Sequence, residues 1–439
     1  MKSMKQLAQL FLIFWLPFSQ ADDLMSIYQL ALQNDPQLQA AKEQLNSARE
    51  TKSLARSQLL PALGLGGTYN SVRSEDKSIS NAPTTTFKTK SLGLNLTQPI
   101  YRRDRLLQLE QADSTIAKAE AEYASAEVDL MVRSTTAYFD ILSAEDDLRV
   151  AQAEREATGR QLEQAQQRFD VGLIAITDVH EAQAAFDAAR ASEIAAINSL
   201  DNTWEALYEI IGPQARSALA KLGENLELSP PEPNKLQNWS DTAQQQNYAI
   251  IASRANLKVL EKQIDISKSG HYPTLDLVGG YNIKRSDMDQ TTSMFDVNES
   301  SIGLSLELPI YSGGAVSATT RQSQANYRAA QQSLDQTRRA INRQVRDAFR
   351  GVLSSISQVE ALKAATVSAQ SALESTQAGY EVGTRTIVDV LNMQRSLFSS
   401  QRDYLNSRYG YILNGLALKS AAGTLSEADL QNVSGWLEQ

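Results

Sequence analysis

Four segments of the chain alternate residue by residue between apolar side chains and small or polar ones. They are 61–70, 88–98, 273–283 and 301–309. In the last of them, Gly303 separates Ile302 from Leu304. A period of two is that of a β-strand with one apolar face. Strands of about ten residues with this alternation, joined by polar loops, are typical of transmembrane β-barrels, so we predict four barrel strands.

Much longer segments place apolar residues at steps of three and four, which is the period of an α-helix. They are 103–170, 178–211, 314–380 and 387–422. No proline occurs between Arg102 and Ile211 or after Pro309. A continuous helix over 103–170 would be roughly 100 Å long. Helices this long and this polar are expected to pack side by side as coiled coils.

The chain also repeats itself. "RFDVGLIAITDV" (168–179) matches "GYEVGTRTIVDVL" (379–391), and "SLGLNLTQPIY" (91–101) matches "SIGLSLELPIY" (301–311). Matched residues lie 210 to 212 positions apart. We therefore predict two copies of one unit, each with the order helix, strand, strand, helix, turn, helix. The expected organisation is a first copy over 22–227, a proline-rich linker over 228–240, a second copy over 241–430 and a C-terminal tail over 431–439.

The N-terminal segment 1–21 has the features of a signal peptide. Lys2 and Lys5 precede a short apolar run, and the segment ends with Ser-Gln-Ala. No later segment is apolar for the ~18–20 residues that a membrane-spanning helix needs. If the exported chain enters a membrane, it must do so as strands.

Composition excludes several classes of function. The formal net charge is −9, so the chain lacks the basic character of a nucleic-acid-binding protein. It has no cysteine, which excludes disulfides, thiolate metal sites and lipid attachment through cysteine. No grouping of nucleophile, base and acid is visible, and no phosphate-binding loop. His180 and His271 are the only histidines, too few for a metal cluster. We expect no catalytic site, cofactor or metal.

Four strands cannot close a membrane barrel, because the smallest have about eight. An open sheet in lipid leaves unpaired edge groups, at several kcal/mol each. Other copies of the chain must therefore complete the barrel. The sequence predicts an α+β membrane protein in which a shared barrel continues into a helical tube.

The chain resembles the TolC family of outer membrane efflux channels over essentially its whole length. The resemblance is carried by "RFDVGLIAITDV" (168–179), "GYEVGTRTIVDVL" (379–391), "LPIYSGG" (308–314) and "LKSAAGTLSEADL" (418–430). It implies a homotrimer with a twelve-stranded β-barrel in outer membrane lipid and a coiled-coil tunnel in the periplasm. It further implies a gated exit duct for efflux and type I secretion. The duct would be opened by a periplasmic adaptor protein and by an inner-membrane efflux pump or ABC exporter.

The resemblance also implies a gate where the helical hairpins turn. Gly172 and Gly383 would occupy the two turns. The family's gate links carry over to Thr177, Asp178, Tyr380 and Arg385, within and between subunits. A further family link, from glutamine to glutamate, would here join Gln161 to Gln377 and be neutral.

At the narrowest point, the family has two pore-facing aspartates three residues apart. The matching residues here are Asp389 and Asn392, so one charged ring would be replaced by a ring of amides. A plainer interpretation is that Asp178 and Asp389 stabilise helix N-termini. Thr386 and Asp389 also have the spacing of a capping box. Capping and gating can coexist.

Two other functions are consistent with parts of the sequence. A periplasmic coiled-coil adaptor or scaffold without channel activity would account for the helices but not for the strands. An envelope hydrolase would need a nucleophile constellation, and the sequence shows none.

Overall fold

The computed structural model describes residues 22–75, 78, 84–214, 216–224, 226–288 and 295–438. The expected signal peptide, 1–21, lies outside the described residues. By their internal contacts the residues form two compact units. Unit 1 comprises Met1–Pro36, Glu127–Ser240 and Gln344–Gln439, and unit 2 comprises Gln37–Ala126 and Asp241–Arg343.

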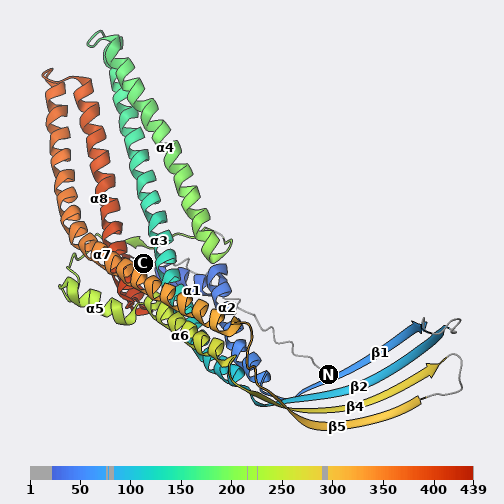
Figure 1. Cartoon of the computed structure of the whole chain (residues 1–439). Coiled ribbons are helices and arrows are strands. Elements are labelled where there is room, and N and C mark those ends of the chain that lie inside the picture. The colour runs from blue at the N-terminus through green and yellow to red at the C-terminus, as the bar shows by residue number, and fades with distance from the viewer. Residues whose placement is uncertain are drawn as a thin grey trace, which may run out of the picture. The chain divides into compact units, whose positions relative to one another are not determined.

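The two halves of the chain present similar series of elements (Figure 1). The first half contains α1 (Leu24–Asn34), α2 (Pro36–Ser57), β1 (Ala62–Ser74), β2 (Thr85–Tyr101), α3 (Arg103–Asp170), α4 (Ile176–Ile211) and β3 (Lys221–Leu222). The second half contains α5 (Leu236–Gln246), α6 (Tyr248–Ser269), β4 (Thr274–Met288), β5 (Phe295–Glu307), α7 (Ala315–Glu381), α8 (Ile387–Ala422), α9 (Glu427–Ser434) and β6 (Leu437–Glu438). Two helices rather than one therefore precede the strands of each half.

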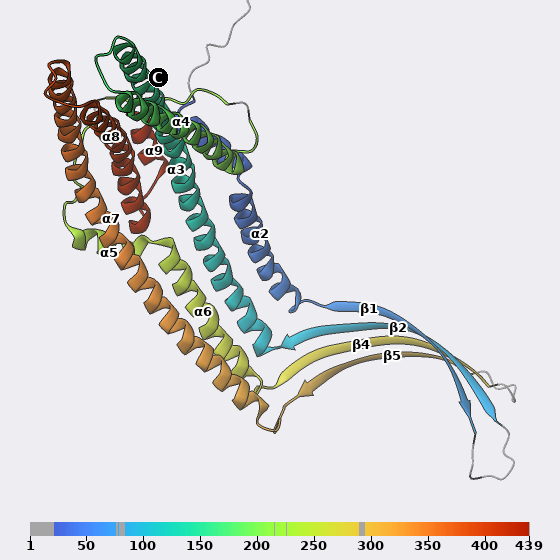
Figure 2. The same cartoon turned by 90° about the horizontal axis from the view of Figure 1, so that it is seen from above.

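Unit 2 contains a four-stranded antiparallel sheet in the order β1-β2-β4-β5 (Figure 2). The central pair, β2 and β4, joins the two halves of the chain. One face of the sheet carries large apolar side chains that are mostly exposed in the single chain, among them Leu65 at 71% and Ile302 at 79%. The opposite face carries glycine, serine, threonine and asparagine. The alternation is that of a sheet with one apolar and one polar face.

All four strands extend further than the hydrophobic alternation, and β1 continues to Ser74 rather than 70. β2 begins at Thr85 rather than 88, β4 continues to Met288 rather than 283, and β5 begins at Phe295 rather than 301. The ladder of backbone hydrogen bonds does not depend on side-chain polarity, so it continues where the apolar face has ended. β5 also ends at Glu307, before Pro309, whose nitrogen has no hydrogen to donate.

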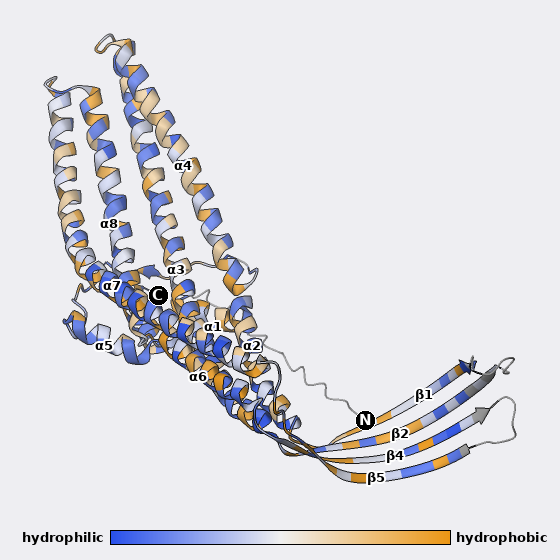
Figure 3. Cartoon of the chain, in the orientation of Figure 1, coloured by the Kyte–Doolittle hydropathy of each residue, from blue (hydrophilic) through white to orange (hydrophobic). Residues whose placement is uncertain are grey.

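Each strand of the sheet in unit 2 is connected along the chain to a helix: α2 precedes β1, α3 follows β2, α6 precedes β4 and α7 follows β5. Ion pairs join them: Lys52 Nζ lies 2.7 Å from Asp113 Oδ1, and Lys262 Nζ lies 2.6 Å from Glu110 Oε2. Both pairs are largely exposed and contribute little each. Polar and apolar residues are mixed along α3 and α7 (Figure 3). Among the described helices, none is both long and apolar enough to cross a membrane.

Unit 1 holds the larger hydrophobic core. Tyr138 and Phe139 of α3 are almost fully buried, and Tyr409 of α8 packs 5.6 Å from the Phe139 ring centre. Asp35 is also buried, at 2% exposure, and accepts two hydrogen bonds from the Arg133 guanidinium at 2.9 and 3.2 Å. A buried carboxylate needs such a partner, because desolvating an unpaired charge is costly.

Two expectations about the chain's connecting segments need correction. The expected linker 228–240 includes the start of α5, where Trp239 is buried and donates its indole N–H to the Pro233 carbonyl at 2.8 Å. The expected tail 431–439 includes the end of α9 and strand β6, which pairs with β3. Prolines and chain ends suggested irregular structure, but burial of a few apolar side chains ordered both segments.

Candidate gate site

The hairpins α3–α4 and α7–α8 of unit 1 turn on one glycine each (Figure 1). Gly172 has φ of +77° and Gly383 has φ of +79°. In the first turn, the N–H of Leu173 donates to the carbonyl of Arg168 and the N–H of Gly172 to that of Phe169. This is the Schellman motif, which requires a left-handed residue after the helix and thus favours glycine.

The second turn repeats this pattern of hydrogen bonds. The N–H of Thr384 donates to the Gly379 carbonyl at 2.8 Å, and the N–H of Gly383 donates to the Tyr380 carbonyl at 3.1 Å. The two turns therefore have the same geometry, although their sequences share little beyond Val-Gly. Each turn exposes apolar side chains, with Val171 70% and Val382 75% exposed.

The start of α8 is capped by side chains. The Thr386 hydroxyl accepts from the N–H of Asp389, and the Asp389 carboxylate accepts from the N–H of Thr386 at 3.0 Å. These hydrogen bonds stabilise the ionised carboxylate, so they lower the pKa of Asp389 below its ordinary value. The capping interpretation of Thr386 and Asp389 thus describes their contacts within one chain.

The start of α4 is different. Its N-cap residue is Ala175, which has no side chain able to accept a hydrogen bond. Asp178 occupies the position that corresponds to Asp389, and its side chain is half-buried. Among the described residues, no hydrogen bond or ion pair engages the Asp178 carboxylate. The two matched aspartates therefore have different local roles, which the sequence alone could not distinguish.

Tyr380 lies in the last turn of α7 and contacts the other hairpin. The guanidinium carbon of Arg168 lies 4.9 Å from the centre of the Tyr380 ring, within the range of a cation–π contact. The Tyr380 hydroxyl oxygen is buried and has no hydrogen-bond partner in the described chain. An unpartnered buried hydroxyl is costly, so this atom is a place where a further group would bind.

The remaining residues expected at the gate lie around these turns. Thr177, Gln377, Arg385 and Asn392 are exposed, whereas Gln161 is half-buried. Within the described part of one chain, no hydrogen bond or ion pair joins Asp178 to Tyr380 or to Arg385. Links between subunits involve a second chain, so the expected gate network stays a prediction.

Arg168 was not among the expected site residues. It stands next to the quoted turn, but only packing of the two hairpins brings it to Tyr380. A row of acids on α3 was also missed: Asp140, Asp147 and Glu154 repeat every seven residues. Asp147 and Glu154 are half-buried, and burial raises the pKa of both above the ordinary value, whereas Asp140 is exposed. The heptad spacing, which puts all three on one helix face, was the available signal.

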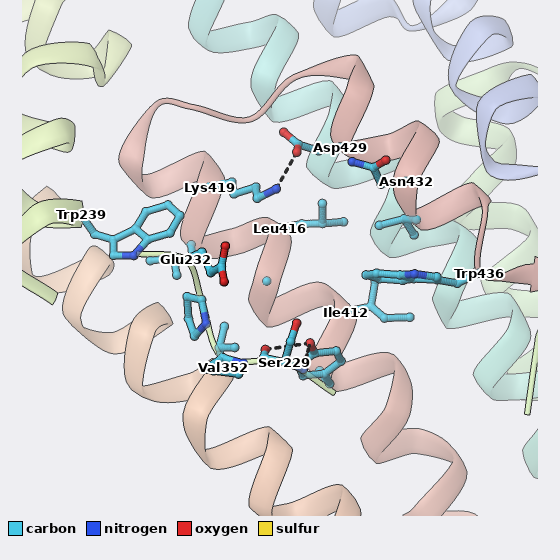
Figure 4. A pocket seen from close by; sticks show the side chains of 16 residues that line it. Ser229, Glu232, Trp239, Val352, Ile412, Leu416, Lys419, Asp429, Asn432 and Trp436 are labelled. Carbon is cyan, nitrogen blue, oxygen red and sulfur yellow. Dashed lines mark hydrogen bonds and ion pairs between the residues drawn. The ribbon is translucent and has the colours of Figure 1, made fainter. Parts of the chain in front are cut away.

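A separate cavity of about 510 Å³ lies in unit 1 between the 228–235 segment, α5, α8 and α9 (Figure 4). Tyr411 and Trp239 hold its proline-rich wall: the Tyr411 hydroxyl donates to the Ser229 carbonyl, and Trp239 donates to that of Pro233. Lys419 and Asp429 form an ion pair of 2.6 Å at its edge. Within the described residues, no cluster of three or more histidines, cysteines or acids could hold a metal ion.

Comparison with known sequences gives matches along most of the chain. The family model described as outer membrane efflux protein matches residues 27–213 and again residues 239–424. The outer membrane protein TolC of Vibrio cholerae is 41% identical over 420 residues, which cover 95% of this chain and 94% of that protein. The TolC of Escherichia coli is 38% identical, over 94% of this chain and 84% of its own length. The alkaline protease secretion protein AprF of Pseudomonas aeruginosa is 28% identical, with 94% and 86% covered.

Solved structures share the fold at lower sequence identity. The Campylobacter jejuni outer membrane channel CmeC superposes with a TM-score of 0.79 at 17% identity, covering 95% of this chain and 90% of that one. The outer membrane protein VceC of Vibrio cholerae gives a TM-score of 0.73 at 20% identity, covering 91% and 96%.

Proposed function

The chain belongs to the outer membrane efflux protein family, and we infer from this membership that it is an outer membrane exit duct for efflux and type I secretion. One observation carries this conclusion: the family match runs through both halves of the chain. The family is one of channels rather than enzymes. The duct is therefore passive, and the energy for export comes from elsewhere.

We propose that three copies of the chain close one twelve-stranded barrel. Strands β1 and β5 are the edges of the sheet, and their outer backbone groups have no partner within the sheet. Unpaired backbone groups cost several kcal/mol each in lipid, so the edges must pair with neighbouring copies. The apolar face of the sheet would then contact lipid, and the glycine- and serine-rich face would line the lumen.

The two halves of the chain are proposed to be copies of one unit. Supporting this are the 210- to 212-residue offsets, the two family matches and the similar order of elements. A duplicated unit in a trimer supplies six similar hairpins around one axis, which suits a tube of antiparallel helices.

We propose that the turns form the gate of this tube. The Asp178 carboxylate and the Tyr380 hydroxyl both lack hydrogen-bond partners among the described residues of one chain, although both are at least partly buried. A hydrogen bond between Tyr380 of one subunit and Asp178 of the next would satisfy both, with Thr177 and Arg385 beside them. Gln161 and Gln377 would add a neutral contact. Gly172 and Gly383 keep the hairpin ends in register.

Asp389 and Asn392 are proposed to line the narrowest part of the pore. They lie one helical turn apart at the start of α8, so they share one face of the helix. The capping box holds the Asp389 side chain in place and keeps it ionised. Three-fold symmetry would give one ring of carboxylates and one ring of amides.

The proposed partners are a periplasmic adaptor and an inner-membrane pump or ABC exporter. The exposed Val171 and Val382 at the turns offer apolar surface at the end of the tube. Exposed apolar groups at a tip of this kind suit a protein partner. Docking there would act directly on the gate.

Channel recordings in planar lipid bilayers test the proposal. The purified protein should give discrete single-channel currents, and Arg385→Ser should increase them by loosening the gate. Lys284→Gln, in the sheet, is a control that should leave the gate unchanged. A coiled-coil adaptor or scaffold would give no current, and that result would overturn the duct.

A further inference from the structure

The register of the sheet places residues of four strands in rows across its apolar face. One such row consists of Leu65, Leu94, Tyr281 and Ser300, which are paired in sequence across β1, β2, β4 and β5. Four residues further along each strand, toward the β1–β2 and β4–β5 loops, another row on the same face consists of Tyr69, Lys90, Arg285 and Asp296. The face thus changes from apolar to aromatic and cationic within a few residues.

The cations gather at this end of the apolar face. Lys90 and Arg285 face each other across β2 and β4, Lys88 is two residues along β2 on the same face, and Arg73 is four residues beyond Tyr69 on β1. All four cationic side chains are exposed. In a chain with net charge −9, a cluster of this kind is a local departure from the average.

Among the described side chains, Arg285 is the one member of this cluster that has an ion pair. Arg285 pairs with Asp296 at 3.0 Å, but among the described side chains neither Lys88 nor Lys90 lies within ion-pair distance of a carboxylate. Asp287 is the backbone partner of Lys88 in the register. Cations directly opposite each other in a sheet repel, as Lys90 and Arg285 do. A bound anion would remove that repulsion.

The position of the cluster decides which anion would bind. On β1, β2 and β4 the next two rows consist of leucine, isoleucine, tyrosine and one glycine on the face proposed to contact lipid, whereas β5 carries Asn298 and Ser300 there. Tyr69 lies in the cationic row itself. Tyrosine and lysine beside an apolar band are typical of the boundary between hydrocarbon and headgroups. A ligand with acyl chains on the apolar rows would present its headgroup to the cations.

We propose that Lys88, Lys90, Arg285 and Arg73 form a binding site for the phosphorylated headgroup of an outer membrane lipid. Phosphate oxygens accept charge-assisted hydrogen bonds from lysine and arginine, and the guanidinium can bind two at once. The site rests on the proposed function, because it requires this face of the sheet to lie in the membrane. A trimer would carry three such sites, at the barrel end beside the loops.

The test uses the purified trimer in nanodiscs that contain a small fraction of diphosphorylated lipid A. The measured quantity is the lipid A that stays bound through detergent washing, quantified by mass spectrometry. The parent should retain lipid A, and the Lys88→Gln/Lys90→Gln double variant should retain it about 30-fold more weakly, at about five-fold for each cation. Dephosphorylated lipid A should bind weakly to both proteins.

Lys284→Gln is the matched control. Lys284 precedes Arg285 in the same strand and is equally exposed, but it points to the opposite face of the sheet. It should bind lipid A like the parent. Lys90→Arg, which keeps the charge, should also bind like the parent. The single variant Lys88→Gln should retain lipid A about five-fold more weakly, and it tests the site if the double variant fails to assemble.

Several outcomes would overturn the site. The double variant could retain as much lipid A as the parent, or Lys284→Gln could lose as much lipid A as the double variant. The parent could retain dephosphorylated lipid A as well as the phosphorylated form. Millimolar inorganic phosphate could displace the lipid fully, which would indicate a free-anion site. Single-channel recording on the same samples separates this proposal from the duct. Conducting trimers that ignore lipid phosphorylation contradict the lipid site alone, whereas a protein that binds lipid A without conducting contradicts the duct.

Discussion

Tyr380→Phe removes one hydroxyl and keeps the ring that packs beside Arg168. This hydroxyl is buried without a hydrogen-bond partner in the part of the single chain that the structure describes, which costs about 1–3 kcal/mol. In an isolated subunit, therefore, phenylalanine should be neutral or stabilising. In a closed trimer the same substitution should be destabilising, because the tyrosine hydroxyl would donate a hydrogen bond to the Asp178 carboxylate of a neighbouring subunit.

The magnitude follows from the chemistry of that link. A hydrogen bond to a charged group contributes about 1.5–3 kcal/mol, so three symmetric links hold the closed state by roughly 5–9 kcal/mol. The cation–π contact with Arg168 remains in the variant, since the Phe ring also has a π-face. The change therefore reports on the hydroxyl alone. We expect higher single-channel conductance and a larger open fraction for Tyr380→Phe.

A double-mutant cycle with Asp178→Ala isolates the pair. If the two groups bind each other, the double variant should open the channel little more than either single variant. Tyr272→Phe is a control, because Tyr272 is 50% exposed and lies outside the hairpins. Parent-like conductance for Tyr380→Phe, or additive effects in the cycle, would refute the link.

Three further predictions concern other parts of the chain. Asn392→Asp should strengthen block by trivalent cations added on the periplasmic side, and Asp389→Asn should nearly abolish it; equal blocking concentrations would place both residues outside the constriction. Gly172→Ala should destabilise unit 1 by about 1–2 kcal/mol in denaturant unfolding, because its φ is +77°, whereas Gly410→Ala, in a helix with open space around it, should be neutral or stabilising by up to ~1 kcal/mol. Glu154 is half-buried, and this burial raises its pKa in the folded state, so the native protein binds more protons and stability falls as pH rises through the window above 4.5. Glu154→Gln should therefore raise the thermal midpoint at pH 7 and leave it nearly unchanged at pH 3; an equal shift at both pH values would contradict the assignment to charge burial.

Local pattern alone was enough for the main elements. The helix expected over 103–170 has the same bounds as α3, because no proline interrupts it and its cap lies next to Gly172. The strands were recognisable because side chains in a strand alternate between its faces, whatever the strand pairs with. Strand ends were less accurate, since backbone pairing continues past the last apolar residue.

Features that join distant residues depended on the tertiary structure. Nothing local to Arg168 or Tyr380 indicates that they meet, and the ordering of the C-terminus depends on β6 pairing with β3 about 215 residues away. Asp178 and Asp389 have matching sequence positions, yet only Asp389 is held by a capping box. The spacing of apolar residues shows which face of a helix or strand is buried, and this spacing is a local property of the sequence. The partner on that face is decided by the packing of the whole chain.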